Sequence, residues 1–375
     1  MAKLVLTTPE SDKRNKRKRA RLDEEVDRTR SRIGRLAKGD GPVLAGPFTG
    51  EVGFELLYWI PLLRWAVEEF PGLRGRLTVI SRGGVQDWIH GLDARYVDIL
   101  SLFQPEEFAA HRALRDKQRK EAEFETRVVD RVRRELGTPE AAVLHPALLY
   151  EAYFRFLKIN QLAYPRSITR DDHGRTVGLT AIYEPIPPPD LGALAAALPD
   201  EYVAVRFYSR DSFPATEESQ RFAARVIQSL RESTNVVLVG QRQALDEHRD
   251  VQGELPPDVV TIDHLLRPEN NLAIQTAVVA SAQMFVGTYG GFSYLAPFLG
   301  VPSLSFSTDP ARTQPWHYEL AQRIFDDPAW GDFVALRHTD LPIIEKVTRR
   351  FPFNGDSAAL DDGPALQLHG GVRPT

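Results

Sequence analysis

The chain has 375 residues, of which 42% are hydrophobic and 26% are charged, a composition typical of a soluble globular protein and a length that suits two domains. Its formal net charge of -4 excludes binding to nucleic acid through overall charge alone. Cysteine is absent, which excludes disulfides, thiolate metal sites and a cysteine nucleophile.

Residues 1–40 form a basic and mixed-charge segment. A cluster of lysines and arginines at 13–21 precedes a mixed-charge run at 22–36. The segment could be a solvated tail that leads into an exposed helix, or it could touch the acidic headgroups of a membrane surface. We expect no nucleic-acid partner, because the cluster lacks aromatic residues that stack on bases. Without an apolar run of about 18 residues or a signal-peptide pattern, we expect a cytoplasmic protein, peripheral to the inner face of the membrane if the cluster binds lipid.

Three apolar runs in the first half are typical of buried strands: Val43–Ala45, Leu77–Ser81 and 96–100. A glycine-rich loop at 46–53 follows the first run, and an apolar helix is expected from Phe54 onward. Pro61 should kink that helix or mark where it restarts. Arg82 follows the second run, at the edge where open α/β sheets bind their ligands.

Two helical segments and a proline-rich connection come next. The pattern at 105–136 predicts one long, highly charged helical region over the surface, as an insertion or as a homodimer contact. The apolar and aromatic residues at 145–157 predict a buried helix. Residues 164–199, with consecutive prolines at 187–189, predict the connection between two domains.

Strands and helices alternate in the second half of the chain. The expected strands are 202–207, 236–240 and 259–262, and the expected helices are 216–233 and 271–282. Short connections between them predict a parallel sheet with helices on both faces. We therefore expect an α/β protein with two Rossmann-like domains that face each other across a cleft. The predicted segments are an N-terminal segment 1–40, a first domain 41–184, a second domain 185–340 and a C-terminal tail 341–375.

The stretch 283–306 combines a strand, a glycine turn, a short helix and a second strand. The turn at 287–291 could take positive φ and let a ligand approach the backbone. Ser293 is predicted to cap a helix that stops at Gly300. The N–H groups of the turn and the helix N-terminus would suit an anion, above all a phosphate. The alternative is a tight strand-to-helix connection that binds no ligand.

Residues 280–302 resemble the donor-site segment of the lipopolysaccharide heptosyltransferase family, in which a strand, a turn, a helix and a Gly-Val-Pro exit hold the nucleotide diphosphate. They also resemble the corresponding part of bacterial and protein fucosyltransferases. Residues 205–210 are similar to the segment of these families in which an arginine follows the first strand of the donor domain. Residues 50–57 are similar to the Gly-x-x-Gly loop on the acceptor side of the heptosyltransferases. These families are GT-B glycosyltransferases, so the resemblance implies the GT-B fold.

The resemblance also implies a function. Its members move a sugar from a nucleotide-diphosphate sugar to a hydroxyl acceptor, here expected to be a carbohydrate, without a metal and with no cofactor besides the donor substrate. The sequence contains no Asp-x-Asp motif and no histidine cluster with metal-ligand spacing. A nucleotide-sugar epimerase or hydrolase on the same plan stays open, as does a non-catalytic nucleotide- or glycan-binding protein. The stereochemical outcome is also open.

The candidate donor-binding residues lie at the ends of the second-half strands: Arg206, Arg210, Gln241, Asp263, His264, Thr288, Gly290, Gly291 and Ser293. Arg206 and Arg210 could bind a diphosphate in a bidentate way, or they could form surface ion pairs. Asp263, His264 and Gln241 lie where related enzymes hold the nucleobase or the ribose. A lone histidine is more often structural, so both interpretations of His264 stay open.

The predicted general base is Glu51, in a flexible loop that faces the cleft, with Glu55 as the second candidate. The chain departs here from the heptosyltransferase pattern, because Phe54 stands where that family often has an acidic residue. Either glutamate could instead cap the following helix. Trp316 and His317 could contribute to the cleft or pack as structural residues. The acceptor-side candidates are Gly50, Gly53 and Arg82.

Overall fold

The structure is a computed structural model that describes residues 9–113, 118, 121–154, 174, 177–240, 249–250, 257–309, 312–313 and 315–341. The chain divides into two compact units, Met1–His338 and Thr339–Thr375, and every strand of the described part lies in the first unit. The domain boundaries expected after residues 40, 184 and 340 stay a prediction.

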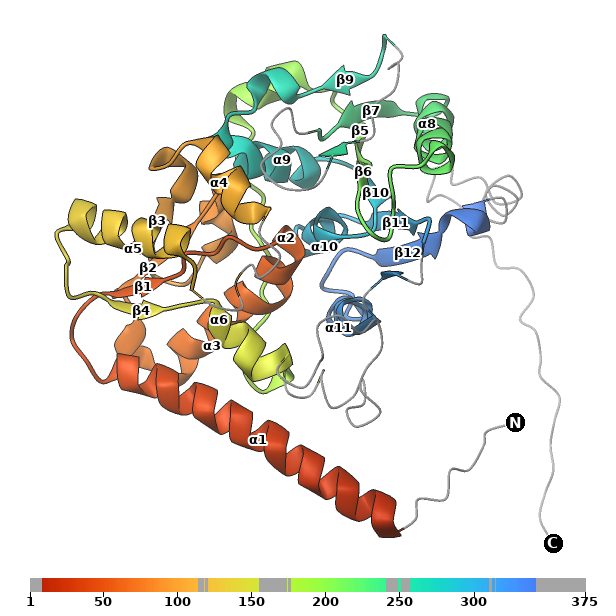
Figure 1. Ribbon diagram of the computed structural model, residues 1–375. Coiled ribbons are helices and arrows are strands. Elements are labelled where there is room, and N and C mark those ends of the chain that lie inside the picture. Colours follow the sequence, from red (N-terminus) through yellow and green to blue (C-terminus); the bar gives the residue numbers. More distant parts are fainter. Residues whose placement is uncertain are drawn as a thin grey trace, which may run out of the picture. The chain divides into compact units, whose positions relative to one another are not determined.

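Two parallel sheets form the framework of the described chain (Figure 1). The first has the order β3-β2-β1-β4 and consists of β1 (Val43–Ala45), β2 (Leu77–Ser81), β3 (Arg95–Asp98) and β4 (Ala142–Leu144). The second has the order β12-β11-β10-β5-β7-β9 and consists of β5 (Tyr202–Arg206), β7 (Asn235–Leu238), β9 (Val260–Thr261), β10 (Met284–Thr288), β11 (Ser303–Ser307) and β12 (Phe333–Arg337). All pairs within both sheets are parallel, which confirms the expected α/β fold with two Rossmann-like halves.

The strand positions differ from expectation in a few places. Neither β4 nor β12 was expected from the sequence. β3 stops at Asp98, whose carboxylate accepts a hydrogen bond from Leu100 N (2.8 Å) and starts a 3-10 turn. A small antiparallel pair, β6 (Tyr208–Ser209) with β8 (Arg249–Asp250), lies just beyond β5.

In each sheet, one strand has later strands of the chain on both of its sides, so the strand order reverses there. In the first sheet, β1 lies between β2 and β4, and in the second sheet β5 lies between β7 and β10. Chain segments leaving neighbouring strands diverge there, and open α/β sheets bind their ligands at this switch point. The register pairs Arg206 at the end of β5 with Gly287 near the end of β10. The expected donor residues therefore start from the switch point of the second sheet.

The helix after β1 has three parts: α2 (Val52–Phe54), a π-helical turn (Glu55–Trp59) and α3 (Ile60–Glu69). It begins at Val52 rather than at Phe54, because Glu51 keeps an extended backbone as the N-cap residue. Pro61 lies at the second position of α3, directly after the π-helical turn, so the helix changes type at the expected place. The carbonyl of Leu57, one turn before Pro61, accepts from the hydroxyl of Tyr183 (2.9 Å). The π-helical turn is the kind of irregularity that recurs at functional sites.

The charged region at 105–136 contains two helices, α4 (Pro105–Arg112) and α5 (Glu123–Leu136), so the expectation of one long surface helix is wrong. Both helices bury an apolar face against the first sheet, as amphipathic helices do. The cluster includes Phe108, Phe124, Val128, Val132, Leu44 and Ile80. The charges alternate with these residues, which hid the buried face in the sequence. The homodimer contact stays a prediction.

The next segments join the two halves. α6 (Ala147–Leu149) and a π-helical turn (Tyr150–Phe154) are the described part of the helix expected at 145–157. The expected connection is described at 174 and from 177 onward. It is tied to both halves, because Ile182 N donates to the carbonyl of Pro61 (3.0 Å) and Ile186 N to that of Phe298 (2.8 Å).

The second half carries α8 (Glu217–Arg231), α9 (Asn271–Ala280), α10 (Gly291–Phe298) and α11 (Pro315–Phe325). The hydroxyl of Thr216 caps α8 by accepting from Ser219 N (3.2 Å). α10 begins at Gly291, not at the expected cap Ser293, whose hydroxyl instead accepts from Gly290 N (3.1 Å). Gly300, with a φ of 76°, follows the end of this helix as expected.

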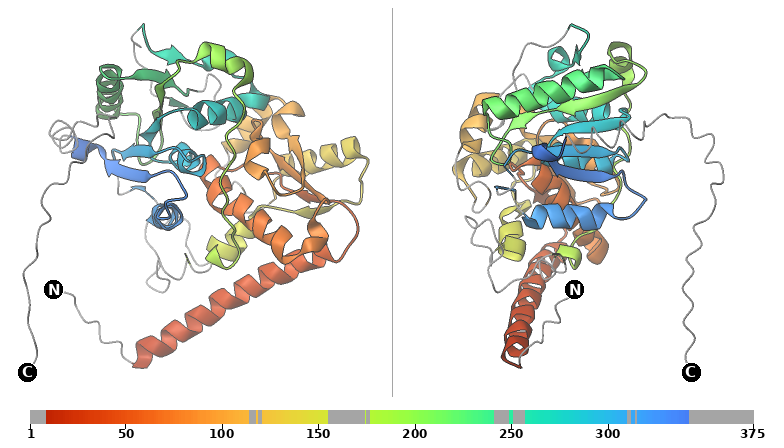
Figure 2. Two further views of the ribbon diagram at one scale, coloured as in Figure 1. Left: turned by 180° about the vertical axis from the view of Figure 1, so that it is seen from behind. Right: turned by 90° about the vertical axis from the view of Figure 1, so that its right-hand side faces the viewer.

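The N-terminal segment is helical over most of its length, as α1 (Pro9–Ala37) (Figure 2). Val26 and Ile33 on its C-terminal part are buried, so this part is not a solvated tail. The side chains of the basic cluster lie almost wholly outside the described set, and membrane contact through 13–21 stays a prediction. Within the described part of the chain, none of the helices combines the length and the apolar composition that a bilayer crossing requires.

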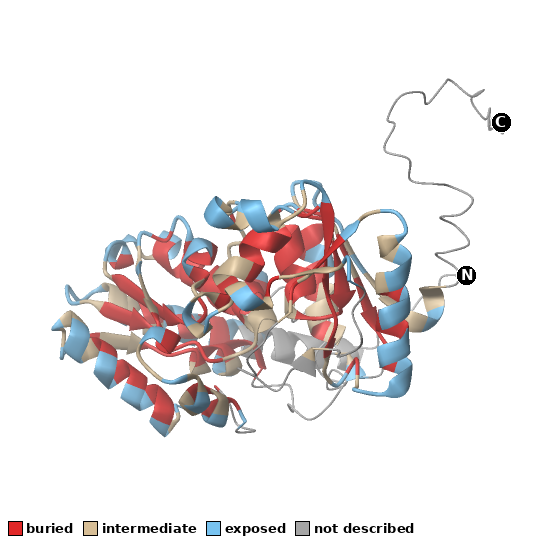
Figure 3. Ribbon diagram, turned by 90° about the horizontal axis from the view of Figure 1, so that it is seen from above, coloured by how far each residue is buried: buried red, intermediate tan, exposed pale blue. Residues whose placement is uncertain are grey.

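The two halves contact each other through several elements of the first unit. α2 lies beside α10, between the two sheets (Figures 1 and 2). Trp88 Nε1 donates to the hydroxyl of Thr276 (3.0 Å), and the N–H of Ala273 donates to the carbonyl of Gly83 (2.9 Å). Figure 3 shows buried residues along the strands of both halves and exposed residues on outer faces of the helices.

Candidate active site

A pocket with about 590 Å³ of empty space, part of it open to solvent, lies where the two halves meet. Its lining comes from the loop after β1, from α2, α4, α9 and α10, and from the ends of β2 and β5. The lining residues are Gly50, Glu51, Val52, Gly53, Arg82, Phe108, Arg112, Arg206, Tyr208, Arg210, Asn271, Leu272, Gly291 and Phe292.

The pocket lining carries more positively charged than negatively charged side chains. Four of its lining residues are arginines, two from each half, and Glu51 is the carboxylate among them. Guanidinium groups keep their charge at every physiological pH and match the oxygens of phosphates and carboxylates. The pocket therefore favours an anionic ligand.

Arg206 is held at the switch point of the second sheet. Only 5% of it is exposed, and its Nε donates to a carboxylate oxygen of Asp250 (3.2 Å). The guanidinium carbon lies 4.5 Å from the ring centre of Phe292 and 5.3 Å from that of Tyr208. These two aromatic rings fix the plane of the guanidinium group in the pocket wall.

Arg210 and Glu51 face each other across the junction of the halves. An oxygen of Glu51 lies 3.9 Å from Nη2 of Arg210, and Arg210 Nη1 donates to the carbonyl of Tyr289 (3.3 Å). The side chain of Glu51 is 42% exposed. The loop residue expected to be the base therefore does reach the pocket, next to an expected donor-binding arginine.

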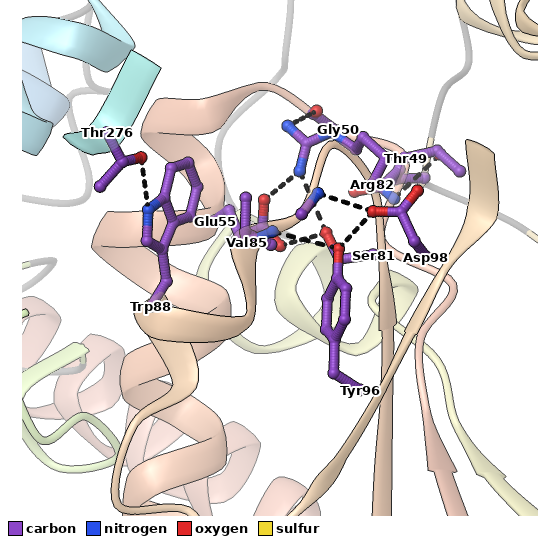
Figure 4. A network of polar contacts seen from close by, with 12 residues as sticks. Thr49, Gly50, Glu55, Ser81, Arg82, Val85, Trp88, Tyr96, Asp98 and Thr276 are labelled. Atoms are coloured by element: carbon purple, nitrogen blue, oxygen red, sulfur yellow. Dashed lines mark hydrogen bonds and ion pairs between the residues drawn. The ribbon is translucent and has the colours of Figure 1, made fainter. Parts of the chain in front are cut away.

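Arg82 lines the pocket from the end of β2, and Glu55 lies beneath it (Figure 4). The carboxylate of Glu55 is buried, pairs with Arg82 Nη1 and accepts from the hydroxyl of Ser81 (2.5 Å). Burial raises the pKa of the Glu55 carboxyl, although Arg82 and Ser81 act in the opposite direction. Arg82 Nη2 donates to the carbonyl of Gly50 (2.9 Å). Glu55 thus holds Arg82 and does not itself line the pocket.

A second carboxylate supports the turn that follows Arg82 (Figure 4). Asp98 accepts from Gly84 N (2.7 Å) and from the hydroxyl of Tyr96 (2.7 Å). Burial raises the pKa of its carboxyl, against the effect of these hydrogen bonds. Gly83 and Gly84 have φ angles of 75° and 79°, which a residue with a Cβ rarely adopts. The hydrogen bond from Gly84 to Asp98 therefore helps to hold this turn, which follows the pocket residue Arg82.

A buried network under the loop was not expected from the sequence. Glu125 of α5 is completely buried, and its carboxylate accepts from the hydroxyl of Thr49 (2.9 Å). His145 Nε2 lies 3.2 Å from its other oxygen, and His111 Nε2 lies 3.5 Å from the first. Burial by itself would raise the pKa of Glu125, but hydrogen bonds from His111 and His145 outweigh it and lower the pKa to about 2.

The glycine turn after β10 faces the pocket only in part. Gly291 and Phe292 line the pocket, whereas Thr288 and Ser293 are fully buried. The hydroxyl of Thr288 donates to the carbonyl of Tyr208 (3.0 Å), and that of Ser293 donates to the carbonyl of Gly290 (2.7 Å). The backbone of this turn touches the pocket, while its two hydroxyls bind other parts of the chain.

Close packing, rather than positive φ, explains the glycines of this turn. Gly290 has an extended φ of 164°. A Cβ on Gly287 would collide with the carbonyl oxygen of Arg206, and one on Gly290 with the hydroxyl of Tyr208. A Cβ on Gly291 would lie 2.7 Å from Cβ of Val52 in the other half. The glycines bring the halves together as closely as α2 and α10 require.

Several expected residues lie elsewhere. Gln241 falls outside the described residues. Asp263 and His264 form a 3-10 turn after β9, where His264 is exposed and neither residue lines the pocket. Trp316 is buried, and His317 Nδ1 bonds the hydroxyl of Tyr58 (2.7 Å), so both pack between the halves away from the pocket lining. A nucleobase contact at Asp263 and His264 stays a prediction.

Some lining residues were missed by the sequence analysis. Tyr208 could have been found, because Arg206, Tyr208 and Arg210 alternate as the same-side residues of an extended chain do. Phe108 and Arg112 are four apart and share one face of α4, but the charged sequence around them concealed it. Within the described residues, no group of three or more histidine, aspartate or glutamate side chains is arranged to hold a metal ion.

No protein-family model matches the chain, and no curated protein matches it. A number of solved structures resemble it at low identity, among them the following three. A glycosyl transferase family 9 structure from Veillonella parvula is 13% identical, with a TM-score of 0.44 over 83% of this chain and 89% of that chain. The ADP-heptose LPS heptosyltransferase II of E. coli is 11% identical, with a TM-score of 0.42 over 82% and 99% of the two chains. The E. coli heptosyltransferase WaaC with ADP is 17% identical, with a TM-score of 0.41 over 82% and 99%. At this level of similarity the geometry of the pocket has to carry the functional conclusion.

Proposed function

We propose that the protein is a glycosyltransferase that moves a sugar from a nucleotide-diphosphate sugar to a hydroxyl acceptor. The observation that carries the proposal is one pocket at the switch points of both sheets, with Arg206 and Arg210 on one side and Glu51 on the other. An arrangement of this kind brings donors that can stabilise an anionic leaving group and a carboxylate that can act as a general base into one pocket.

Arg206 and Arg210 bind the diphosphate of the donor in this proposal. Both guanidinium groups line the pocket, and the start of α10 lies beside them at Phe292. Forked N–H donors match phosphate oxygens, and a helix N-terminus adds partial positive charge. As the bond from the sugar to the diphosphate breaks, the leaving oxygen gains negative charge that these groups stabilise. The reaction then needs no resident cofactor.

Glu51 acts as the general base. Its partly exposed carboxylate lies in the pocket, 3.9 Å from Arg210. The proton of the acceptor hydroxyl passes to a Glu51 oxygen while the acceptor oxygen bonds to the sugar and the diphosphate leaves with the bonding electrons.

Glu55, the second candidate for the general base in the sequence analysis, has a different role in this proposal. Because it is buried and bound to Arg82 and Ser81, Glu55 holds Arg82 in place. Arg82, Gly50 and Gly53, which line the pocket, bind the acceptor in this proposal. A carbohydrate acceptor, a homodimer and membrane contact through residues 13–21 remain predictions.

A thermal-shift screen with UDP-, GDP-, ADP- and dTDP-linked sugars tests the proposal. A ligand that binds only the folded protein raises the unfolding midpoint by mass action. We expect one nucleotide class to raise the midpoint and its nucleoside diphosphate to do so as well, because the arginines contact the diphosphate. If none of the four donors moves the midpoint, the proposed function is contradicted.

Product analysis with the selected donor separates the proposal from its alternatives. With a hydroxyl acceptor present, the transferase forms a glycoside and the nucleoside diphosphate in equal amounts. Free sugar or an isomerised donor without any acceptor would instead indicate a hydrolase or an epimerase. Binding without any turnover, across a broad acceptor panel, would indicate a non-catalytic binding protein.

A further inference from the structure

Two guanidinium groups hold the backbone immediately before Glu51. Arg112 Nη1 donates to the carbonyl of Thr49 (2.6 Å), and Arg82 Nη2 donates to the carbonyl of Gly50 (2.9 Å). Both arginines are buried to more than nine tenths. The loop expected to be flexible is therefore fixed at the two residues before the proposed base.

Thr49 is the residue on which the buried contacts converge. None of its surface is exposed. Its hydroxyl donates to Glu125 (2.9 Å) and accepts from His111 Nε2 (3.1 Å). Its carbonyl accepts from Arg112 Nη1. Contacts from α4 and α5 thus end on one residue, two positions from Glu51.

Glu125 is the one carboxylate at the centre of these contacts. Beyond Thr49, it accepts from Ala122 N (3.0 Å) and faces His145 Nε2 at 3.2 Å. His145 Nδ1 accepts from Ala147 N (3.0 Å), so the proton of the neutral ring lies on Nε2, the nitrogen that is near Glu125.

We infer that Glu125, although it does not line the pocket, is a positioning residue that fixes Thr49 and thereby the direction of Glu51. The inference rests on the proposed function for the role of Glu51. A fully buried carboxylate has a large desolvation cost, and an apolar pair of the same shape is often as stable. Fixed geometry of a catalytic loop is a benefit that an apolar pair would not provide.

The test uses Thr49→Val, which keeps the shape of the side chain and removes the hydroxyl, and Thr49→Ser, which restores it. Thr180→Val is the matched control, because Thr180 is equally buried and its hydroxyl bonds Tyr153 (2.6 Å) far from the loop in sequence. Glu125→Gln tests the carboxylate itself. Each variant is measured for unfolding midpoint, for hydrogen exchange of residues 46–53, and for donor Kd, KM and kcat.

We expect Thr49→Val and Glu125→Gln to speed exchange at 46–53 and to lower kcat by about tenfold to a hundredfold, because misplacement by about 1 Å can cost this much. Donor Kd should stay near the wild-type value, since Arg206 and Arg210 are untouched. Thr49→Ser should recover most of kcat, and Thr180→Val should lower the midpoint without changing exchange at 46–53.

Two results would overturn the inference. One is a Thr49→Val variant that loses stability like Thr180→Val and keeps wild-type kcat, which would make the network purely structural. The other is unchanged exchange at 46–53 in both network variants. If the wild-type protein has no transferase activity with any donor, the proposed function fails, while the exchange measurement still decides whether Glu125 fixes the loop.

Discussion

The two switch points that meet at the pocket are built in different ways. In the first half, Arg82 and Arg112 each bind a backbone carbonyl of the loop, and Arg82 is also paired with buried Glu55. In the second half, Arg206 lies over the rings of Tyr208 and Phe292 and meets a half-buried carboxylate, Asp250. The arginines of the first half therefore hold the backbone of the loop, whereas Arg206 in the second half is available to a ligand in our proposal.

This difference indicates a division of labour. Catalysis by a general base depends on where the base lies, so the half that carries Glu51 benefits from a rigid loop. Binding of a diphosphate depends on forked N–H donors in the pocket wall, so the other half benefits from arginines held by aromatic faces. Four variants or conditions can break this comparison or sharpen it.

The largest expected effect belongs to Glu51→Gln. Losing the general base should lower kcat by about 10²- to 10⁴-fold, while donor binding stays close to wild type because the amide keeps the shape. Steady-state kinetics and calorimetric titration with the donor measure the two quantities. Glu217→Gln, an exposed residue of α8, is the control. If Glu51→Gln keeps the wild-type kcat, Glu51 is not the general base.

Arg206→Ala should show the converse pattern. Losing charge-assisted hydrogen bonds worth about 1.5–3 kcal/mol should weaken binding of the donor and of its nucleoside diphosphate by roughly tenfold to a hundredfold. Arg221→Ala, which removes an exposed arginine of α8, should bind like wild type. Equal affinities for the two variants in a calorimetric titration would place the diphosphate elsewhere.

Gly291→Ala tests the contact between the halves. A Cβ at this position would lie 2.7 Å from Cβ of Val52, so either α2 or α10 has to shift. We expect a loss of about 1–3 kcal/mol in the free energy of unfolding, the usual range for overpacking. Gly178→Ala is the matched control, because a Cβ there would meet no atom within 4 Å. Denaturant unfolding measures both, and equal losses would contradict a close contact at Gly291.

The pH dependence of stability tests the buried network with a smaller effect. The pKa of Glu125 is lowered from 4.5 to about 2 in the folded protein. A depressed pKa adds stability that is fully present above the unfolded value and is lost as the pH falls from about 4.5 towards 2. The free energy of unfolding of wild type should therefore approach that of Glu125→Gln over this interval. If the free energies of unfolding of the two proteins change with pH in parallel, the charge of Glu125 does not contribute to stability.

The sequence predicted the elements around the pocket well where a short apolar run met a glycine. Both main loops and the donor-side arginines were placed correctly at strand ends, because parallel strands end at one edge of the sheet. Position in the chain did not, however, predict what each side chain contacts. Ser293 and Thr288 follow β10 as expected, yet their hydroxyls satisfy backbone groups.

The buried network was beyond the reach of sequence reasoning for a physical reason. Thr49 and Glu125 are 76 residues apart, and no local pattern connects them. Glu125 also lies among the charged residues of α5, where burial and exposure alternate within one turn. The amphipathic face of α5 was detectable in principle, but the burial of a glutamate on it was not, since charged residues are rarely buried unless paired.

Hydrogen exchange of the wild-type protein, with and without the nucleoside diphosphate of the selected donor, tests the central claim most directly. The account predicts slower exchange at residues 206–210 and 289–293 together, with little change at 46–53, because that loop is already fixed. Protection confined to other segments, such as the groove around Asp87 and Asp93 at the far side of the first half, would contradict a diphosphate site between the two switch points.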